Sequence, residues 1–260
     1  MSEQVTVAIP FHGCPDMLRH CLRSVLAQTH NNLQVIVIAD GTKPGPLPRD
    51  SRLTVYRLPD NRGAYYARAI ALAATTTTHH AIVDADDWIH PDWLAAMLNI
   101  DTTGAVQQGA RWIEQDGHEP YAKPWKNAKA EPGSTFRHQT SHVGIYRTNR
   151  LRDLGGYSPA YRMSWDSLLV GLIRMTGPVN ILPNPMYHRR RHPASLVQAP
   201  ATKLGSPARL KVRAHLANLY KQAWPLRDNI PAIRDLALTE TPAQLWEEVQ
   251  EHAERLRKKG

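Results

Sequence analysis

The chain lacks an apolar run long enough to cross a membrane. A spanning helix needs roughly 20 consecutive apolar residues, and no segment of the 260-residue sequence approaches that length. A basic-then-apolar leader is missing as well, because the N-terminus passes directly into the strand-like residues 5–9. We therefore expect a cytoplasmic protein without a transmembrane segment.

Cysteine is also scarce, since Cys14 and Cys21 are the only two in the chain. They lie in one short stretch with no second pair, which argues against a disulfide framework and against a cysteine zinc site. We interpret both as reduced, structural thiols. No internal repeat is visible, and the hydrophobic share of 42% and the charged share of 21% are those of an ordinary globular protein.

Negative charge is in deficit. The chain has 32 Lys and Arg residues against 23 Asp and Glu residues, which gives a formal net charge of +9. Such an excess attracts anionic partners. Diphosphate groups, nucleic acids and anionic lipid surfaces all qualify, so peripheral attachment to a membrane surface stays an option. A solvated basic face without a specific partner is the common alternative.

Strand-like and helix-like segments alternate in the first part of the chain, as in a mainly parallel sheet flanked by helices. The apolar, β-rich runs cover residues 5–9, 33–38, 53–58 and 80–84, and the helix-like stretches cover residues 15–28, 63–74 and 91–99. The ligand of such an α/β domain lies at the carboxyl ends of the strands. A polar stretch at residues 117–133 is predicted to be a surface loop.

The β pattern ends near Pro200. After a further predicted helix at residues 165–175, the C-terminal part of the chain favours helices at residues 206–222, 231–238 and 242–258. The last of them has Thr241 as its predicted N-cap and Pro242 in the first helical position. We divide the chain into an α/β domain of residues 1–200 and an α-helical C-terminal extension of residues 201–260.

The clearest chemical signal is an apolar strand that stops at three carboxylates, Asp84, Asp86 and Asp87. Strand alternation would aim Asp84 and Asp86 to the same side, where both could bind one divalent cation and the phosphate oxygens that it holds. An acidic turn in which Asp87 or Asp92 caps the next helix is the alternative. Asp40 also ends an apolar strand and is placed to accept a hydrogen bond from a nucleotide base, although an Asp-Gly pair is a common turn as well.

Taken in order, these and other motifs resemble those of the family 2 glycosyltransferases, which have the GT-A fold. The resemblance extends over about residues 5–196. It rests on residues 7–12 (VAIPFH), residues 22–29 (LRSVLAQT), Asn61-Arg62-Gly63 with Ala67-Arg68, residues 83–87 (VDADD), Gly155-Gly156-Tyr157, Trp165-Asp166 and residues 190–195 (RRHPAS). A match of several motifs in the family's order is far more specific than any one of them.

The resemblance implies a metal-dependent, inverting glycosyltransferase that moves a sugar from a nucleoside-diphosphate sugar, with a UDP- or dTDP-sugar favoured and Mn²⁺ or Mg²⁺ as the metal. It implies Asp166 as the general base, which would take a proton from the acceptor hydroxyl. The implied metal ligands are Asp84, Asp86 and His192. The residues that it places at the donor are Pro10, Phe11, Asp40, Arg68, Asp84, Ala85, Asp86 and Arg190.

Two positions depart from the family's pattern. Ala39 precedes Asp40 where many relatives have a first acidic residue, and Trp165 precedes Asp166 where they have glutamate. The second residue of each pair, which the resemblance implies in the chemistry, is kept. The departures therefore bear on donor details and acceptor shape rather than on catalysis.

Other classes of protein are disfavoured by specific absences. A sugar nucleotidyltransferase would have a Gly-rich Arg-Lys phosphate loop after the first strand, which this chain lacks. A nucleic-acid-binding protein would show a long basic stripe with interleaved aromatic residues. The acceptor is left open, as a glycan, a lipid-linked glycan, a small molecule or a polyanion such as DNA. The helical extension is expected to pack on the catalytic domain, on another subunit of a homo-oligomer or on that acceptor.

Overall fold

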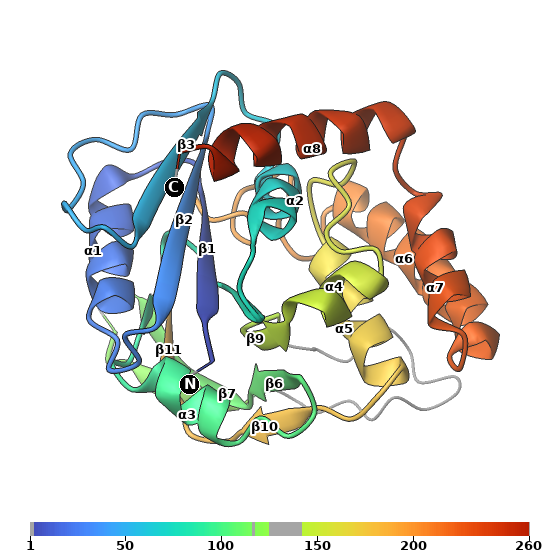
Figure 1. The fold of residues 1–260 in the computed structure, drawn as a ribbon, viewed down its shortest axis with the longest axis horizontal. Helices are drawn as coiled ribbons and strands as arrows, with labels where there is room; N and C mark the ends of the chain where they lie inside the picture. Colours follow the sequence, from blue (N-terminus) through green and yellow to red (C-terminus); the bar gives the residue numbers. More distant parts are fainter. Residues whose placement is uncertain (1–2, 116–117, 125–141, 260) are drawn as a thin grey trace.

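A computed structural model describes residues 3–115, 118–124 and 142–259. Its centre is a seven-stranded sheet (Figure 1). The strands are β1 (Val5–Phe11), β2 (Leu33–Asp40), β3 (Leu53–Leu58), β4 (His79–Ile82), β6 (Ala105–Gln108), β9 (Gly144–Arg147) and β10 (Asn180–Leu182). They lie in the order β10-β6-β9-β4-β1-β2-β3, and each neighbouring pair is parallel except the two that β9 forms. The mainly parallel α/β sheet predicted from the sequence is confirmed.

Helices cover both faces of this sheet, which explains why its strands are continuous apolar runs. In β2, Val35 and Val37 face the core formed with α1 (Pro15–Leu26) and α3 (Trp93–Asn99). The side chains between and after them, Ile36 and Ile38, face the core formed with α2 (Ala64–Ala74), α4 (Thr148–Asp153) and α5 (Trp165–Met175). Parallel strands buried in this way bring their carboxyl ends to one edge of the sheet, where ligands of α/β folds bind.

The C-terminal helices share the second of these cores. They are α6 (Pro207–Ala223), the short 3₁₀ helix η1 (Trp224–Leu226), α7 (Ile230–Leu238) and α8 (Ala243–Arg257). Leu216 of α6, Ile233 of α7 and Val249 of α8 are buried in one cluster with Ile70 of α2 and Leu168 of α5. Helix α8 packs across α2 (Figure 1). The C-terminal helices are therefore confirmed and pack on the α/β part, whereas a domain boundary at residue 200 stays a prediction.

Replacing Leu216 by alanine tests whether these helices complete the core. Leu216 is fully buried, so the substitution is expected to lower the free energy of unfolding by about 2–5 kcal/mol, the range for cavity-forming changes of this type. Leu210 lies on the same helix but is 55% exposed, so Leu210→Ala is the matched control and should change stability by no more than about 0.5 kcal/mol. Denaturant unfolding of both variants measures the difference. Equal stability of the two would contradict the shared core.

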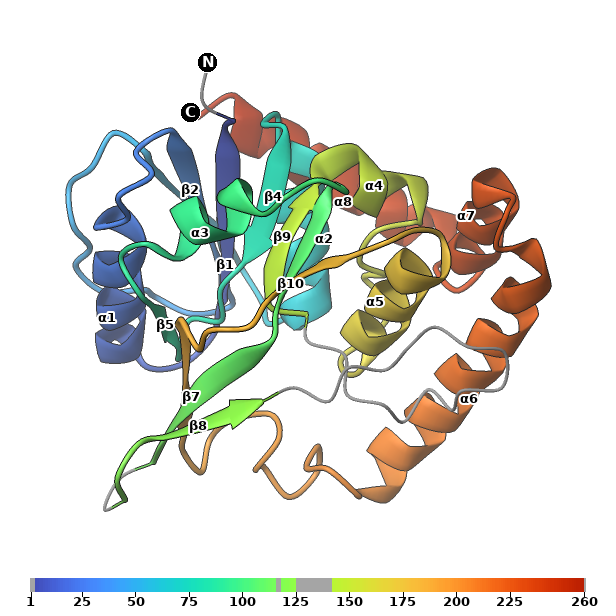
Figure 2. The same cartoon turned by 90° about the horizontal axis from the view of Figure 1, so that it is seen from below.

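A second sheet extends from the central one (Figure 2). It contains β5 (Trp88–Ile89), β11 (Tyr187–Arg191), β7 (Ala110–Gln115) and β8 (Tyr121–Pro124), in that order. Strand β8 lies inside residues 117–133, so the prediction of a loop there was wrong for this part, and residues 117 and 125–133 lie outside the described residues. A polar edge strand is difficult to recognise because only one side of its backbone pairs and most of its side chains remain accessible to water.

Two expectations about local ends were also wrong. Strand β4 ends at Ile82 rather than at Asp84, because the chain turns there, with the Asp87 N–H donating to the Asp84 carbonyl at 3.0 Å. The N-cap of α8 is Pro242 rather than Thr241. The Thr241 hydroxyl is instead hydrogen-bonded to Ser158 in the protein interior. Among the described residues, no helix combines the length and the apolar character that crossing a membrane requires.

His80 lies fully buried in β4, and it makes the stability of the protein depend on pH. Its Nδ1 is hydrogen-bonded to the Thr75 hydroxyl at 2.9 Å, and its Nε2 has no partner among the described residues. Burial, with a smaller contribution from Arg152, lowers the pKa of His80 from 6.5 to about 3. As the pH falls below 6.5, His80 becomes protonated in the unfolded chain but stays neutral in the folded protein. Protonation of His80 therefore lowers the free energy of unfolding below pH 6.5 and has no effect on it above that pH.

Because of His80, the free energy of unfolding is expected to fall by about 3 kcal/mol between pH 7 and about pH 4.5, at roughly 1.4 kcal/mol for each pH unit below 6.5. His80→Gln keeps a polar side chain without an ionisable group, so its unfolding free energy should depend on pH less steeply by this amount. Denaturant titrations of both proteins across this range provide the measurement. Parallel pH profiles of the two proteins would contradict a neutral, buried His80.

Candidate active site

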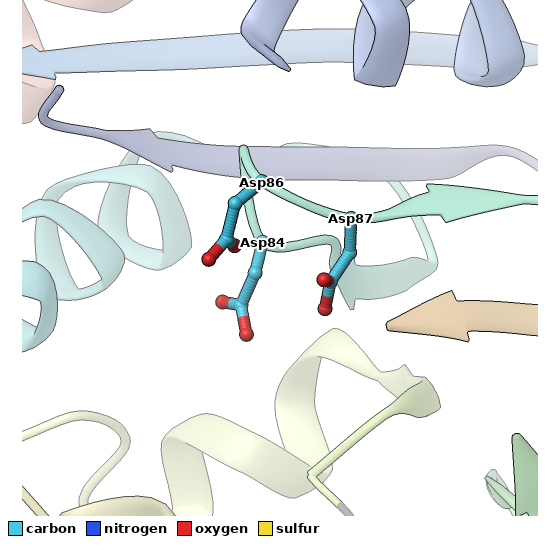
Figure 3. Close-up of side chains that lie close together, drawn as sticks. All are labelled: Asp84, Asp86 and Asp87. Atoms are coloured by element: carbon cyan, nitrogen blue, oxygen red, sulfur yellow. The ribbon is translucent and has the colours of Figure 1, made fainter. Parts of the chain in front are cut away.

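The turn after β4 brings three carboxylates together at the carboxyl edge of the central sheet. Asp84, Asp86 and Asp87 each offer an oxygen, and these oxygens lie within 4.8 Å of one another. Figure 3 shows the three side chains pointing to the same side of the turn. Asp84 and Asp86 thus share a side, as the sequence predicted, although the turn rather than strand alternation produces this arrangement.

The electrostatics of this triad fit a divalent cation. Burial, together with the charge of Asp84, raises the pKa of Asp86, and the His192 imidazole only partly opposes this shift. Burial and the charges of Asp86 and Asp84 raise the pKa of Asp87 well above its usual range. Crowded carboxylates of this kind are relieved by a cation, and hard divalent ions prefer carboxylate oxygens. His192, the third predicted ligand, lies beside the triad, with its Nε2 at 2.9 Å from the Asp86 carboxylate.

Asp84 is held by a cation from α2. The Arg68 guanidinium donates to its carboxylate at 2.6 Å, and Arg68 is only 6% exposed. Burial opposes ionisation of Asp84, but the charges of Arg68 and His142 outweigh it and keep the pKa of this carboxyl low. The sequence placed Arg68 near the donor phosphates, and the structure brings it into direct contact with the triad.

Asp40 lies at the end of β2 and links two of the sequence motifs. Its carboxylate accepts the backbone N–H groups of Arg62 at 2.6 Å and of Gly63 at 2.7 Å. A Cβ on Gly41 would lie 2.3 Å from the Asn61 nitrogen, so only glycine fits where the two loops touch. Asp40 is 2% exposed, and its contact with a nucleotide base stays a prediction.

The other residues predicted at the donor lie along the same edge. Pro10 is partly exposed near the end of β1, Phe11 is buried in the core beside α1, and Ala85 is partly exposed between two of the triad carboxylates. Arg190 lies in β11, where its backbone N–H donates to Asp87 at 2.9 Å and its guanidinium lies 3.1 Å from the ring of His20. Roles for these four residues in binding stay predictions.

Asp166 lies in the first turn of α5, opposite the triad. Its Oδ1 accepts the Tyr65 hydroxyl at 2.5 Å. The residue before this helix turn, Ser164, has φ 67°, the only positive φ of a non-glycine residue among those described. Trp165 is buried, and its indole N–H donates to the Gly156 carbonyl at 2.8 Å. The tryptophan that departs from the family's pattern is therefore a core residue that anchors the start of α5.

Two residues at the site, Tyr65 and His142, were missed in the sequence, and the candidate for a functional role is His142. Its Nε2 lies 3.3 Å from the Asp84 carboxylate and its Nδ1 lies 3.2 Å from the Asp166 carboxylate. Burial lowers the pKa of His142, but Asp84 and Asp166 outweigh it and raise the value to about 9. The same ion pair keeps the pKa of Asp166 low despite burial. No motif or spacing singles out this histidine, and only its position just before the short strand β9 could have drawn attention to it.

The whole arrangement is therefore a chain of charges across the edge of the sheet. Arg68 contacts Asp84, Asp84 contacts His142, and His142 contacts Asp166. The triad side offers oxygen ligands and cations that suit a metal-bound diphosphate. The Asp166 side offers an ionised carboxylate that can accept a proton. An open α/β sheet with an acidic turn at this edge is the architecture of a GT-A glycosyltransferase.

Comparison with known proteins identifies the family. The description "Glycosyl transferase family 2" matches residues 6–163. The chain therefore belongs to glycosyltransferase family 2, as its motifs predicted.

Curated relatives agree with this assignment at low identity. The chain is 28% identical over 235 residues to the putative glycosyltransferase EpsH of Bacillus subtilis (strain 168), and the aligned region covers 77% of this chain and 64% of that protein. It is 27% identical over 103 residues to the glycosyltransferase GlyA of Streptococcus pneumoniae serotype 4, and this alignment covers 37% of this chain and 15% of that protein. The chain thus spans less than two thirds of the length of these relatives.

Solved structures show the same fold. The crystal structure of S. aureus TarS 1–349 in complex with UDP-GlcNAc superimposes with a TM-score of 0.63 and 17% sequence identity, over 96% of this chain and 79% of that one. Another crystal structure of TarS 1–349 gives a TM-score of 0.57 and 14% identity, over 97% of this chain and 91% of that one. At such identities the similarity concerns the fold alone.

Proposed function

We propose that the chain is a metal-dependent, inverting glycosyltransferase that uses a nucleoside-diphosphate sugar, with UDP as the favoured nucleotide. The observation that carries the proposal is the histidine that joins the acidic turn to a separate carboxylate, with His142 3.3 Å from Asp84 and 3.2 Å from Asp166. A group that holds the leaving diphosphate and a group that accepts a proton must both lie near the reacting carbon for one displacement to use both, and one imidazole bridges Asp84 and Asp166. The similar fold seen in complex with UDP-GlcNAc supports a UDP-sugar donor.

Asp84 and Asp86 would hold the divalent cation, Mn²⁺ or Mg²⁺, and His192 is in position to assist them through its contact with Asp86. A bound cation of this kind would neutralise the negative charge that builds on the leaving diphosphate. Asp87 has a different role, because its two oxygens accept the Tyr187 hydroxyl at 2.7 Å and the Arg190 N–H at 2.9 Å. It therefore fixes β11, and with it Arg190, against the acidic turn.

Asp166 would act as the general base. The ion pair with His142 keeps its pKa low, so the carboxylate is ionised at neutral pH. It would accept the proton of the acceptor hydroxyl as that oxygen attacks C1 of the sugar. The bond between C1 and the diphosphate oxygen breaks on the opposite face, the electron pair leaves with the nucleoside diphosphate, and the configuration at C1 inverts. Tyr65 and His142 each occupy one oxygen of Asp166 and hold the carboxylate in one orientation.

The donor would lie along the edge between β1, β2 and the acidic turn. Arg68 and Arg190 would pair with diphosphate oxygens, a role for which the planar guanidinium is suited. Asp40 would orient the nucleotide base. Its present partners, the backbone N–H groups of Arg62 and Gly63, fix the loop that would line this part of the site.

A screen of nucleotide sugars tests the proposed function. The protein is incubated with UDP-, dTDP-, GDP- and ADP-sugars and Mn²⁺, and the released nucleotide is measured with and without candidate acceptors. The expected result is release of a nucleoside diphosphate, with UDP fastest, and a product whose anomeric configuration is opposite to that of the donor. Retention of the donor's configuration, or release of pyrophosphate in place of the diphosphate, would contradict it.

His142→Ala tests the role of the bridging histidine. Loss of a side chain that orients a catalytic or ligating carboxylate is expected to lower kcat by about 10–100-fold. His90→Ala is the control, because the side chain of His90 is 48% exposed and lies outside this charge chain. If His142 acts through Asp166, the double variant with Asp166→Asn should be no slower than Asp166→Asn alone. Rates that fall independently in the double variant would exclude that coupling.

A further inference from the structure

Strand β11 carries a row of arginines that faces the active site. Side chains alternate along a strand, so Arg189 and Arg191 share a face with Tyr187. The Tyr187 hydroxyl donates to Asp87 at 2.7 Å, which shows that this face looks toward the acidic turn. On the opposite face of β11, the ring of His188 stacks on Trp88 with centroids 3.4 Å apart.

The neighbouring strands extend this row. Arg189 is in register with Ile113 of β7, two residues after Arg111, so Arg111 lies on the same face. Arg111 is in turn paired with Lys123 of β8. Burial and the charges of Arg189 and Arg191 lower the pKa of Arg111 to about 10, as expected for cations gathered on one surface.

Helix α6 brings further cations to the side of Asp166. The chain leaves β11 and crosses to the start of α6 (Figure 2). There, Arg209 is 8% exposed and donates to the backbone carbonyls of Leu196 and Thr202. Burial lowers the pKa of Arg209, the charges of Tyr65 and Asp166 oppose the shift, and Arg213 and Arg189 add to it. Arg209 is therefore close enough to interact electrostatically with both Asp166 and Arg189.

Three of these cations, Arg189, Arg191 and Arg213, form no ion pair with a carboxylate of the described residues. The arginine ion pairs found there involve Arg19, Arg52, Arg62, Arg68, Arg227 and Arg255. Cations held close together raise one another's electrostatic energy unless an anion binds between them.

We propose that Arg189 and Arg191, with Arg209 and Arg213, bind a phosphate group on the acceptor. This inference rests on the proposed function, since it takes Asp166 to be the base that marks the acceptor side. Arginine is suited to the task because its planar fork can donate two hydrogen bonds to one phosphate. A phosphate held between β11 and α6 would position the acceptor next to Asp166, separate from the donor diphosphate beside Asp84 and Arg68. Part of the chain's net positive charge would then bind a specific anion, the acceptor phosphate.

The experiment measures binding to the UDP-loaded protein, so that the donor site is filled. Three matched pairs serve as probes: glucose 6-phosphate with glucose, glycerol 3-phosphate with glycerol, and N-acetylglucosamine 6-phosphate with N-acetylglucosamine. Binding is followed by ligand-observed NMR with UDP and Mn²⁺ in excess. At least one phosphate ester should bind, at least about tenfold more tightly than its neutral partner, as expected for one or more charge-assisted contacts.

The variant R189Q/R191Q should remove that preference and leave the affinity for UDP unchanged. R227Q/R255Q is the matched control, since it removes the same charge from exposed positions, and R189K/R191K retains charge if the glutamine variant does not fold. Absence of binding by all three esters, or equal loss of UDP and ester binding in R189Q/R191Q, overturns the proposal. Binding of a single-stranded oligonucleotide through these arginines without ester binding also overturns it. If the wild type binds no nucleoside diphosphate, the proposed function itself fails.

Discussion

Asp166→Asn is expected to lower kcat for sugar transfer by about 10²–10⁴-fold, the usual range for loss of a general base. The amide keeps the size of the side chain but cannot take up the proton of the acceptor hydroxyl. The affinity for UDP should change little, because Asp166 contacts the triad through His142 rather than directly. Steady-state kinetics at saturating substrates and calorimetric titration of UDP measure the two effects.

Tyr65→Phe separates loss of the base from loss of its orientation. The phenol donates to Asp166 at 2.5 Å, so its removal frees one carboxylate oxygen and leaves the group able to accept a proton. A smaller loss of kcat, about 10–100-fold, is expected for one hydrogen bond to a charged carboxylate. If Asp166→Asn retained more than about a tenth of wild-type kcat, less than the loss expected of a base, Asp166 would be a helix-terminal carboxylate without a part in the chemistry.

Asp86→Ala is expected to abolish measurable transfer and to weaken Mn²⁺-dependent binding of UDP by more than about 100-fold, beyond the range for residues that only support a ligand. The fold should survive. Burial and the charge of Asp84 already disfavour the ionised form of Asp86, so the metal-free variant should unfold at the same temperature as the wild type or slightly higher. Calorimetry with Mn²⁺ and thermal unfolding test both statements.

Asp228→Ala is the matched control for this change, because the side chain of Asp228 is 90% exposed and Asp228 lies between η1 and α7 rather than in the acidic turn. It should leave both transfer and UDP affinity unaltered. Near-normal UDP affinity of Asp86→Ala in the presence of Mn²⁺ would remove Asp86 from the metal site, and Asp84 with Asp87 would be the remaining pair of triad carboxylates.

Most of the fold could be predicted because local pattern and tertiary structure agree. The strand at residues 33–40 is apolar without interruption over residues 35–39, and burial of both its faces in the structure accounts for that pattern. Helix α1 repeats its apolar residues at Leu18, Cys21, Leu22 and Val25, the spacing of one helical face. In contrast, β8 at Tyr121–Pro124 has no apolar face to recognise, because it is an edge strand with largely exposed side chains.

The candidate site could be predicted only where its residues belong to motifs. Asp84, Asp86 and Asp166 stand in such motifs, and the structure brings them to one edge of the sheet. His142 and Tyr65 could not be predicted, since each becomes part of the site only through tertiary contacts, those of His142 with Asp84 and Asp166 and that of Tyr65 with Asp166. The same holds for Arg189 and Arg191 of β11, because a basic run in the sequence does not show which of its side chains face the site.

The C-terminal helices illustrate a further limit. Their positions could be predicted from caps and periodicity, but their role in the core could not. Periodicity shows that α6 has an apolar side, and only the structure shows that Leu216 packs in one cluster with residues of α2 and α5. A tail that looks like an appendage in the sequence thus completes one face of the catalytic domain.

Calorimetric titration of UDP into the wild-type protein, once with Mn²⁺ and once with EDTA, tests the central claim most directly. If the acidic turn holds a metal-bound nucleoside diphosphate, UDP should bind with Mn²⁺ and lose at least about tenfold in affinity with EDTA, which corresponds to about 1.4 kcal/mol. Equal affinity in the two conditions, or no binding of UDP or any other nucleoside diphosphate in either, would contradict the account.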